Sequence, residues 1–546
     1  MADKAVRLTT QQFVEHFWPI PHGVNVPPAP DTNPFVNIPT LTSEAAIAQD
    51  FVQYAAICNY TLTPGMLFRL STGKADVDLP GGAKSHMDGA FFRLNNPVIL
   101  PADGRPHYAD QAIGVEFKAS IDPFSDGENP CPEARDQKEA RGQVISHTET
   151  VFSVQHRVAF FVLVVVGKTC RITLWDRSGV LVTTSFDYCT NWVLFCEILW
   201  RMSQCPDEQL GCDPTARRIY PWDPLWLTMD RASEERASDA DHKMRKLRSD
   251  ELLDDSNIVF SYVREMFSKS LEGAPRYVLD VPDGNAVRQY LIGHPTFVAK
   301  GMACRGTEGF VALDRQTEEF AWLKDCWRNN AGVPNVPTKI CYGDLRGQFT
   351  ITPQMWRDRH MLHGPKVAFA IRAAKDDVEG ACPPEFDSSC PLHLHLHTRL
   401  VVKEVGLPLK EFLYGIQLLN VVADCVEVRV RPNGVRVITW TGLLCDWELS
   451  KPLNWQDKAP RRSERSGTWQ FMSAALLQCN EKKVEISDEL ESFFNVILYH
   501  AVRYLDSNLT PKQVGIFIDE YFDQFKCYDG VWTCGNRKLQ VITNGQ

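Results

Sequence analysis

Two carboxylates and one amine in the first quarter of the chain are spaced for metal-dependent chemistry. Asp88 opens one apolar, strand-like run, and Glu116 and Lys118 end a second one. Side chains two residues apart on a strand share a face, and a hairpin would bring Asp88 to the same sheet edge. Two carboxylates can hold Mg²⁺, and a lysine can help a water molecule attack a phosphodiester.

The elements expected around these residues resemble the restriction-endonuclease-like fold with its Asp…Glu-x-Lys motif. A helix begins near Ser43, two strands follow at 88–94 and 112–119, a polar helix at about 132–155 carries Gln143, and buried strands come next. This order covers roughly residues 43–180. Because Glu-x-Lys is common by chance, an exposed cross-strand pair of Glu116 and Lys118 stays open as the alternative.

A second set of chemically suited residues lies in the C-terminal half. Gly301 and Gly306 belong to a turn whose backbone amides could approach phosphate oxygens. Lys324 follows in an apolar strand, and far downstream another apolar strand ends at Asp446. A strand lysine suits nucleotide phosphates, and a carboxylate at a strand end suits Mg²⁺.

Six segments in this half resemble the fungal-specific protein kinases, a family expanded in mushroom-forming fungi. They are RGT at 305–307, LKDCW at 323–327, VGLPL at 405–409, GLLCDWELS at 442–450, SGTWQFMS at 466–473 and DELESFF at 488–494. The similarity spans about 290–530, and WDRSG at 175–179 matches the N-terminal region of the same family. The resemblance implies a two-lobed kinase fold with ATP and Mg²⁺ between the lobes.

The resemblance also implies a role for each matching residue. Lys324 would pair the nucleotide phosphates and Asp446 would hold Mg²⁺. Residues near Glu404 would form the hinge between the lobes. Gly301, Gly306 and Thr307 would lie in the turn that covers the phosphates.

Two catalytic elements of a kinase are missing from the sequence. The strand lysine needs a glutamate on the following helix (αC), and the reaction needs a catalytic loop whose aspartate accepts the hydroxyl proton. Residues 328–337 contain no glutamate, and their prolines and glycine exclude a helix of several turns. Residues 420–445 contain no histidine for a His-Arg-Asp loop. Asn433 stands about where a second metal ligand belongs, although its Pro-Asn-Gly context is first of all a turn signal. We therefore expect impaired phosphotransfer, in a pseudokinase or in a gene model that skips coding segments.

Composition limits the class of protein. The 546 residues are 44% hydrophobic and carry a net charge of −10, which excludes wholesale disorder and gives no global attraction to nucleic acid. The 17 cysteines include no Cys-x-x-Cys pair, and MADKAVRLTT has no apolar signal core, so we expect reduced thiols and a cytoplasmic or nuclear protein. The most apolar run, 158–167, is about half of a membrane-spanning helix.

These patterns predict an α+β multidomain chain. We expect an N-terminal arm at 1–42, a nuclease-like α/β domain at 43–230, a charged linker at 231–256 and a kinase-like domain at 257–546. That domain would divide into an N-lobe at about 257–403 and a C-lobe at about 404–546. An amphipathic helix at 257–271 is expected to pack beside the N-lobe sheet in place of the missing helix. His393, His395 and His397 alternate along what we expect to be a half-exposed strand that leads to the hinge, an interpretation we favour over a zinc site.

Two functions therefore remain. The first is a fungal-type Ser/Thr protein kinase, impaired in this chain, with ATP, Mg²⁺ and a protein substrate or partner. The alternative is a pseudokinase scaffold whose N-terminal module recognises nucleic acid, or cleaves it with Asp88, Glu116 and Lys118.

Overall fold

The computed structural model describes residues 4–36, 38, 43–57, 62–71, 86–94, 107–127, 130–131, 134–241, 259–299, 301–302, 305–328, 339–360, 390, 392–426, 468–479, 482, 484–528 and 531–544. They form two compact units. The first contains the described residues up to Ala240 and those within Asn257–Ala331 and Lys339–Lys403; the second contains Asp241 and the described residues from Glu404 onward. Among these residues, no helix has both the length and the apolar character that crossing a membrane requires.

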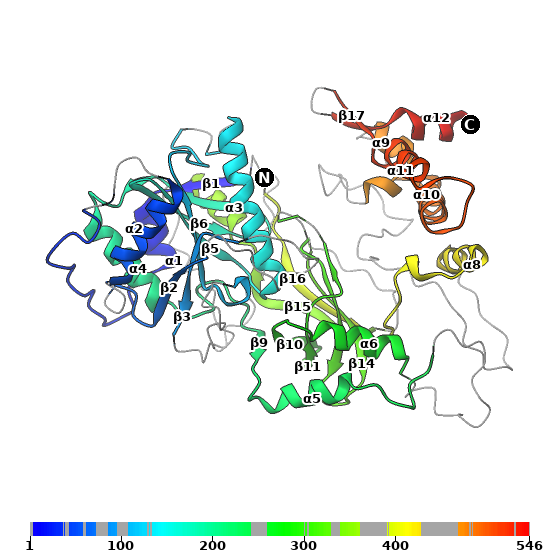
Figure 1. Ribbon diagram of the computed structural model, residues 1–546, viewed down its shortest axis with the longest axis horizontal. Helices are drawn as coiled ribbons and strands as arrows, with labels where there is room; N and C mark the ends of the chain where they lie inside the picture. Colours follow the sequence, from blue (N-terminus) through cyan, green and yellow to red (C-terminus); the bar gives the residue numbers. More distant parts are fainter. Residues whose placement is uncertain are drawn as a thin grey trace. The chain divides into compact units, whose positions relative to one another are not determined.

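An eight-stranded mixed sheet forms the N-terminal part of the first unit (Figure 1). Its order is β1-β7-β6-β5-β4-β3-β2, with β8 paired to β6. The strands are β1 (Ala5–Leu8), β2 (Met66–Leu70), β3 (Gly89–Arg93), β4 (Ile113–Lys118), β5 (Phe160–Val166), β6 (Thr169–Trp175), β7 (Val180–Thr183) and β8 (Phe186–Asp187). Because β1 pairs in parallel with β7, the segment expected to be an extended arm supplies a strand of the sheet.

Helices cover both faces of this sheet. α1 (Thr10–Phe17), α2 (Glu44–Ile57) and α4 (Trp192–Gln204) lie on one face, and α3 (Arg135–Val154) lies on the other (Figure 1). Side chains of a strand alternate between faces, so a strand covered on both sides must be apolar throughout. β5 meets this requirement: Phe161, Leu163 and Val165 pack with the first three helices, and Phe160, Val162 and Val164 pack with α3.

The elements around the predicted carboxylates follow the order α2-β2-β3-β4-α3-β5. β2, β3 and β4 are antiparallel, whereas β4 and β5 are parallel and joined through α3. This order contains one strand more than the sequence predicted, Met66–Leu70, which is too short to show a clear period. Asp88 directly precedes β3, and Glu116 and Lys118 lie near the end of β4.

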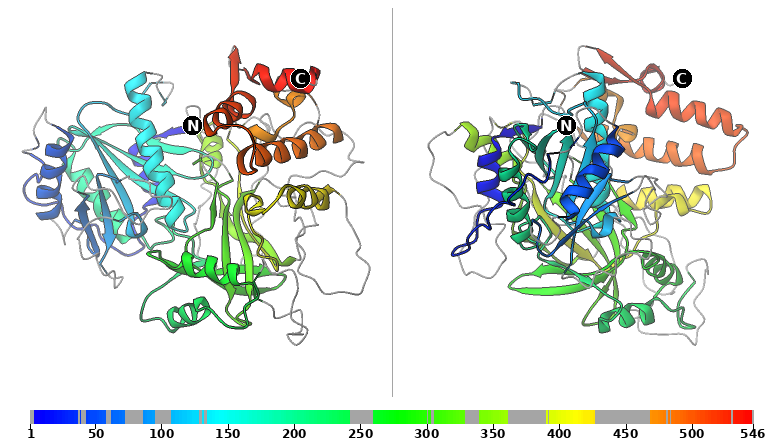
Figure 2. Two further views of the ribbon diagram at one scale, coloured as in Figure 1. Left: turned by 45° about the vertical axis from the view of Figure 1, so that its right-hand side comes forward. Right: turned by 60° about the vertical axis from the view of Figure 1, so that its left-hand side comes forward.

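An antiparallel sheet forms the rest of the first unit (Figure 2). Its order is β15-β16-β14-β13-β11-β10-β9, with β12 paired to β13. The strands are β9 (Ala216–Ile219), β10 (Arg276–Asp283), β11 (Ala286–Ile292), β12 (Phe297–Val298), β13 (Glu308–Asp314), β14 (Phe320–Arg328), β15 (Lys339–Phe349) and β16 (Leu396–Val402). The glycine turn lies between β12 and β13, and β14 carries Lys324.

Two helices accompany this sheet, α5 (Pro224–Ser233) and α6 (Ser261–Ser270), whereas α7 (Thr352–His360), which follows β15, contacts β1 of the first sheet. α6 contacts β13, and the ring of Phe267 packs edge-on against Phe320 at 5.2 Å. The predicted packing of this helix beside the second sheet is therefore confirmed; that the sheet is a kinase N-lobe stays a prediction. Residues 329–338, where the αC helix was expected to be missing, lie outside the described residues.

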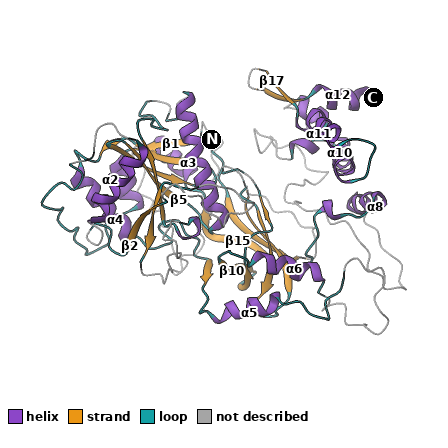
Figure 3. Ribbon diagram, viewed as in Figure 1, coloured by secondary structure: helices purple, strands orange, loops and turns teal. Residues whose placement is uncertain are grey.

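The second unit is mainly helical (Figure 3). It contains α8 (Gly415–Val426), α9 (Ala474–Gln478), α10 (Ile486–Tyr504), α11 (Pro511–Ile518), α12 (Asn536–Asn544) and a hairpin of β17 (Phe525–Tyr528) and β18 (Val531–Cys534). Ser473 caps α9 by accepting from the backbone N of Leu476, and its hydroxyl donates to Asp488 on α10 at 2.6 Å. The positions predicted for the catalytic loop, Asn433 and Asp446 lie outside the described residues.

Candidate functional site

Glu116 and Lys118 form a buried ion pair at the end of β4. Lys118 Nζ lies 2.9 Å from Glu116 Oε1, and the side chains are 7% and 2% exposed. His147 on α3 places Nδ1 3.1 Å from the other carboxylate oxygen of Glu116. Asp88 accepts a hydrogen bond from the backbone N of Phe117 at 2.9 Å. The structure thus brings the three predicted residues to one place on the sheet.

The electrostatics of Asp88 reflect a second carboxylate nearby. Burial and, to a lesser extent, the negative charge of Glu116 raise its pKa to about 6, against the opposing effects of the Phe117 N–H and the charge of Lys118. Two carboxylates that disfavour joint ionisation are typical of a site that receives a cation.

The partners of Glu116 keep that carboxylate ionised. Burial raises its pKa, but the hydrogen bond and charge of His147, together with Lys118, outweigh this effect, and the pKa of Glu116 lies below its usual value. Burial lowers the pKa of Lys118, yet Glu116, Glu44 and Asp88 raise it above the usual value. The ammonium group is therefore close to three carboxylates.

His147 and Glu44 were missed by the sequence analysis, which had selected Gln143 instead. Gln143 lies on the exposed side of α3, apart from this cluster. A signal for His147 was present, because it lies next to Thr148 in the buried stripe of α3 that also contains Val144 and Val151.

No group of three or more His, Cys, Asp and Glu side chains in the described part of the chain is arranged to hold a metal ion. Mg²⁺ usually retains several waters and binds through one or two carboxylates. Asp88 and Glu116 are the pair that fits such an ion, with Lys118 supplying positive charge and a hydrogen bond to Glu116 and with His147 in contact with its other carboxylate oxygen.

Lys324 lies in the middle of the second sheet. On β14 it stands opposite Gly309 of β13 and Leu400 of β16, and it is half-buried. Asp325, the next residue, projects to the other face, where it contacts His397 and Arg399. Lys324 therefore faces away from the buried polar network described below.

The glycine turn is an excursion between β12 and β13. Ala299 N donates to Thr307 O at 2.8 Å, which closes the turn. Gly301 and Gly306 have φ angles of +107° and +48°, in the region that favours glycine. The amide of Gly301 donates to Glu149 Oε1 on α3 at 2.6 Å. The Gly301 amide, which was predicted to face phosphate, thus donates its hydrogen bond to a carboxylate.

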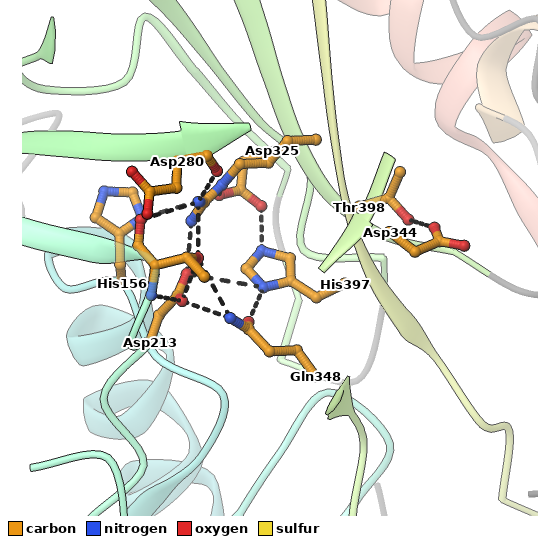
Figure 4. Close-up of polar contacts among 10 residues, drawn as sticks. His156, Asp213, Asp280, Asp325, Asp344, Gln348, His397 and Thr398 are labelled. Carbon is orange, nitrogen blue, oxygen red and sulfur yellow. Dashed lines mark hydrogen bonds and ion pairs between the residues drawn. The ribbon is translucent and has the colours of Figure 1, made fainter. Parts of the chain in front are cut away.

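A buried polar network joins three strands of the second sheet to Asp213, which lies between α4 and β9 (Figure 4). Arg399, 0% exposed, places Nη2 2.5 Å from Asp213 Oδ2 and Nε 3.0 Å from Asp325 Oδ2. His397 contacts Asp325 through Nε2, and its Nδ1 lies 2.5 Å from Gln348 Oε1. His397 is thus buried and hydrogen-bonded, which corrects the expectation of a half-exposed histidine strand.

The turn at 175–179 makes a second set of buried contacts, with residues 350–352 that follow β15. Asp176 is fully buried, and its Oδ2 accepts from the backbone N of Ile351 and of Thr352, each at 2.7 Å. Ser178 donates to Thr350 Oγ1 at 2.7 Å. The conformation of this turn is therefore fixed by residues of the second sheet region.

Glu404, expected at the hinge, follows β16 and is the first residue of the C-terminal segment that forms most of the second unit.

The family comparison agrees with this architecture. Residues 129–335 match the family model described as fungal protein kinase. The match covers less than half of the chain; it includes α3, the glycine turn and Lys324, and leaves out Asp88, Glu116 and Lys118. No curated protein and no solved structure matches the chain. Residues 129–335 are therefore similar to the fungal protein kinase family.

Proposed function

We propose that the second sheet is the nucleotide-binding lobe of a kinase-family protein, in which Lys324 pairs the phosphates of Mg²⁺-ATP. The observation that carries the proposal is the position of Lys324. Counted from β11, which leads into the glycine turn, β14 is the third long strand, and the phosphate-pairing lysine of kinases lies on their third strand. The family match over 129–335 supports the same assignment.

We further propose that phosphate transfer is impaired. The strand lysine of an active kinase is held by a helix glutamate, and the 328–337 sequence offers none. The 420–445 sequence offers no His-Arg-Asp loop to accept the hydroxyl proton. A lobe that binds nucleotide without transferring phosphate would act through protein partners, as a pseudokinase scaffold does.

Incubation of the full chain with labelled ATP, Mg²⁺ and a basic model protein tests both parts. We expect no incorporation above that of the Lys324→Met variant. Lys339→Met is the matched control, because Lys339 is an exposed lysine on β15. Strong incorporation that disappears only in Lys324→Met would contradict the impairment and establish an active kinase.

A second candidate function is metal-dependent cleavage of a phosphodiester by the N-terminal sheet. It rests on the convergence of Asp88, Glu116 and Lys118 and on the order α2-β2-β3-β4-α3-β5. In this proposal the two carboxylates bind Mg²⁺, and the Lys118 ammonium stabilises the attacking water or the negative charge that develops on the phosphate. The substrate would be a nucleic-acid backbone.

Cleavage assays with DNA and RNA, single- and double-stranded, test this candidate in the presence of Mg²⁺ or Mn²⁺. Asp88→Asn, Glu116→Gln and Lys118→Met should each lower the rate at least 100-fold, since each removes a group that contacts metal or substrate. Gln143→Ala should retain activity, because Gln143 is exposed and apart from the cluster. Cleavage that persists in Asp88→Asn would contradict the assignment.

A further inference from the structure

The glycine turn is anchored to the N-terminal sheet domain by three separate contacts. The first is the hydrogen bond from Gly301 N to Glu149 Oε1 at 2.6 Å. Successive backbone amides in a turn can bind anions. Here the Glu149 carboxylate accepts the hydrogen bond of one such amide. A phosphate oxygen would compete with Glu149 for the same donor.

The second contact is hydrophobic. Met302 is 2% exposed and belongs to the core cluster on the α3 face of the N-terminal sheet, with Val144, Val151 and Phe152. Withdrawing Met302 would expose its side chain and leave a gap in this core. The turn is therefore held by burial as well as by a hydrogen bond.

The third contact involves Gly306. A Cβ atom at this position would lie 2.4 Å from Nε of Arg177, so the guanidinium packs directly on the glycine backbone. Arg177 is 5% exposed and lies 4.8 Å above the ring of Phe152. Only glycine permits this approach.

Lys324 and the polar network around Asp325 lie on opposite sides of the second sheet. Neighbouring residues of a strand face opposite sides, so Asp325 and Lys324 diverge. The Asp325 side is covered by the N-terminal domain, because Arg399 pairs there with both Asp213 and Asp325. A turn fastened by these contacts presents the Gly301 amide to Glu149 and not to a nucleotide bound at Lys324.

We propose that the N-terminal domain autoinhibits nucleotide binding by holding the glycine turn through Glu149, Met302 and Arg177. The inference rests on the proposed binding of nucleotide at Lys324, and it assigns Glu149 as a residue that regulates this binding. A nucleotide phosphate would replace the Glu149 carboxylate at the Gly301 amide only when the turn is released from its contacts with Glu149, the Met302 core and Arg177. Weakening one anchor should therefore increase the affinity for Mg²⁺-ATP.

Two measurements on the full chain test the proposal separately from the proposed function. Hydrogen–deuterium exchange of the peptide spanning 297–310 reports whether the turn is held. Calorimetric titration with Mg²⁺-ATP reports nucleotide binding. The informative variant is Glu149→Ala, and the matched control is Glu139→Ala, an exposed glutamate on the same helix. Met302→Ser, which weakens a different anchor, provides an independent variant should Glu149→Ala fail to fold.

We expect Glu149→Ala to increase exchange of the turn and to tighten Mg²⁺-ATP binding by about tenfold, the effect of one hydrogen bond to a charged group. Adding Lys324→Met should abolish that gain, and Glu139→Ala should match the wild type. Unchanged exchange, or equal ATP affinity of wild type and Glu149→Ala, would overturn the autoinhibition while leaving nucleotide binding intact. Faster exchange with no ATP binding in any variant would overturn the proposed function and the autoinhibition with it.

Discussion

Replacing Arg399 by methionine is expected to destabilise the first unit by about 3–5 kcal/mol, the cost of removing one partner from a buried ion pair. The Arg399 side chain is 0% exposed and contacts two carboxylates, Asp213 at 2.5 Å and Asp325 at 3.0 Å. Methionine retains an unbranched apolar stem but leaves both carboxylates buried without the guanidinium between them. Because two charges lose their partner at once, we expect the upper part of this range.

The loss should depend on pH in a defined direction. Burial raises the pKa values of Asp213 and Asp325, but Arg399 and His397 outweigh burial, and both pKa values lie below the usual range. A carboxyl with a depressed pKa stabilises the fold above its unfolded pKa, near 3.9, and this contribution is lost as the pH falls. Arg399→Met raises both pKa values, so its deficit relative to wild type should shrink between pH 7 and pH 4.

Urea unfolding of the full chain, followed by tryptophan fluorescence, measures the effect. Arg135→Met is the matched control, because Arg135 pairs with Glu139 on the surface, where the side chains are 92% and 65% exposed. This control should match the wild type. Combining Arg399→Met with Asp213→Asn and Asp325→Asn should recover part of the loss. A urea midpoint of Arg399→Met equal to that of Arg135→Met would refute the reasoning.

Three further predictions follow from individual groups. Mn²⁺ binding at Asp88 requires the ionised carboxylate, whose pKa is about 6. The Mn²⁺ affinity measured by calorimetry should therefore rise about tenfold per pH unit below pH 6 and level off above pH 6. Asp88→Asn should abolish Mn²⁺ binding. Burial raises the pKa of Glu308 to about 8, partly opposed by Arg177, so wild-type stability should fall as the pH rises from 4.5 to 8. Glu308→Gln should remove this slope in thermal unfolding scans. Ser473→Ala removes a helix cap and a hydrogen bond to buried Asp488, and should cost about 1–2 kcal/mol, measured as faster hydrogen exchange in α9.

Local patterns predicted the parts of the fold that depend on neighbouring residues. The two-residue spacing of Glu116 and Lys118 predicted their shared face, and the apolar run at 158–167 predicted buried β5. β1 was missed because Ala5–Leu8 is short and pairs with Val180–Thr183, far away in the sequence. No local signal identifies such a partner.

The contacts of the buried polar network could not be predicted for the same reason. Asp213, Asp325 and Arg399 are separated by more than seventy residues each, and a lone charged residue in an apolar segment does not identify its partner. Glu149 is one more polar residue of a polar helix until Gly301 is placed against it. Lys324, by contrast, was found from its strand and from its position after a glycine turn, which are local features.

The central claim, that nucleotide phosphates bind beside Lys324, is tested most directly by labelling with an acyl-phosphate derivative of ATP. Such a reagent acylates a lysine that lies next to the bound phosphates, and peptide mass spectrometry identifies the modified residue. We predict that Lys324 is labelled in wild type, more strongly in Glu149→Ala, and that excess Mg²⁺-ATP protects it. Lys339, exposed on β15, should react without protection. The claim would be contradicted if Lys324 is not labelled in either the wild type or Glu149→Ala, or if Mg²⁺-ATP does not suppress the labelling of Lys324.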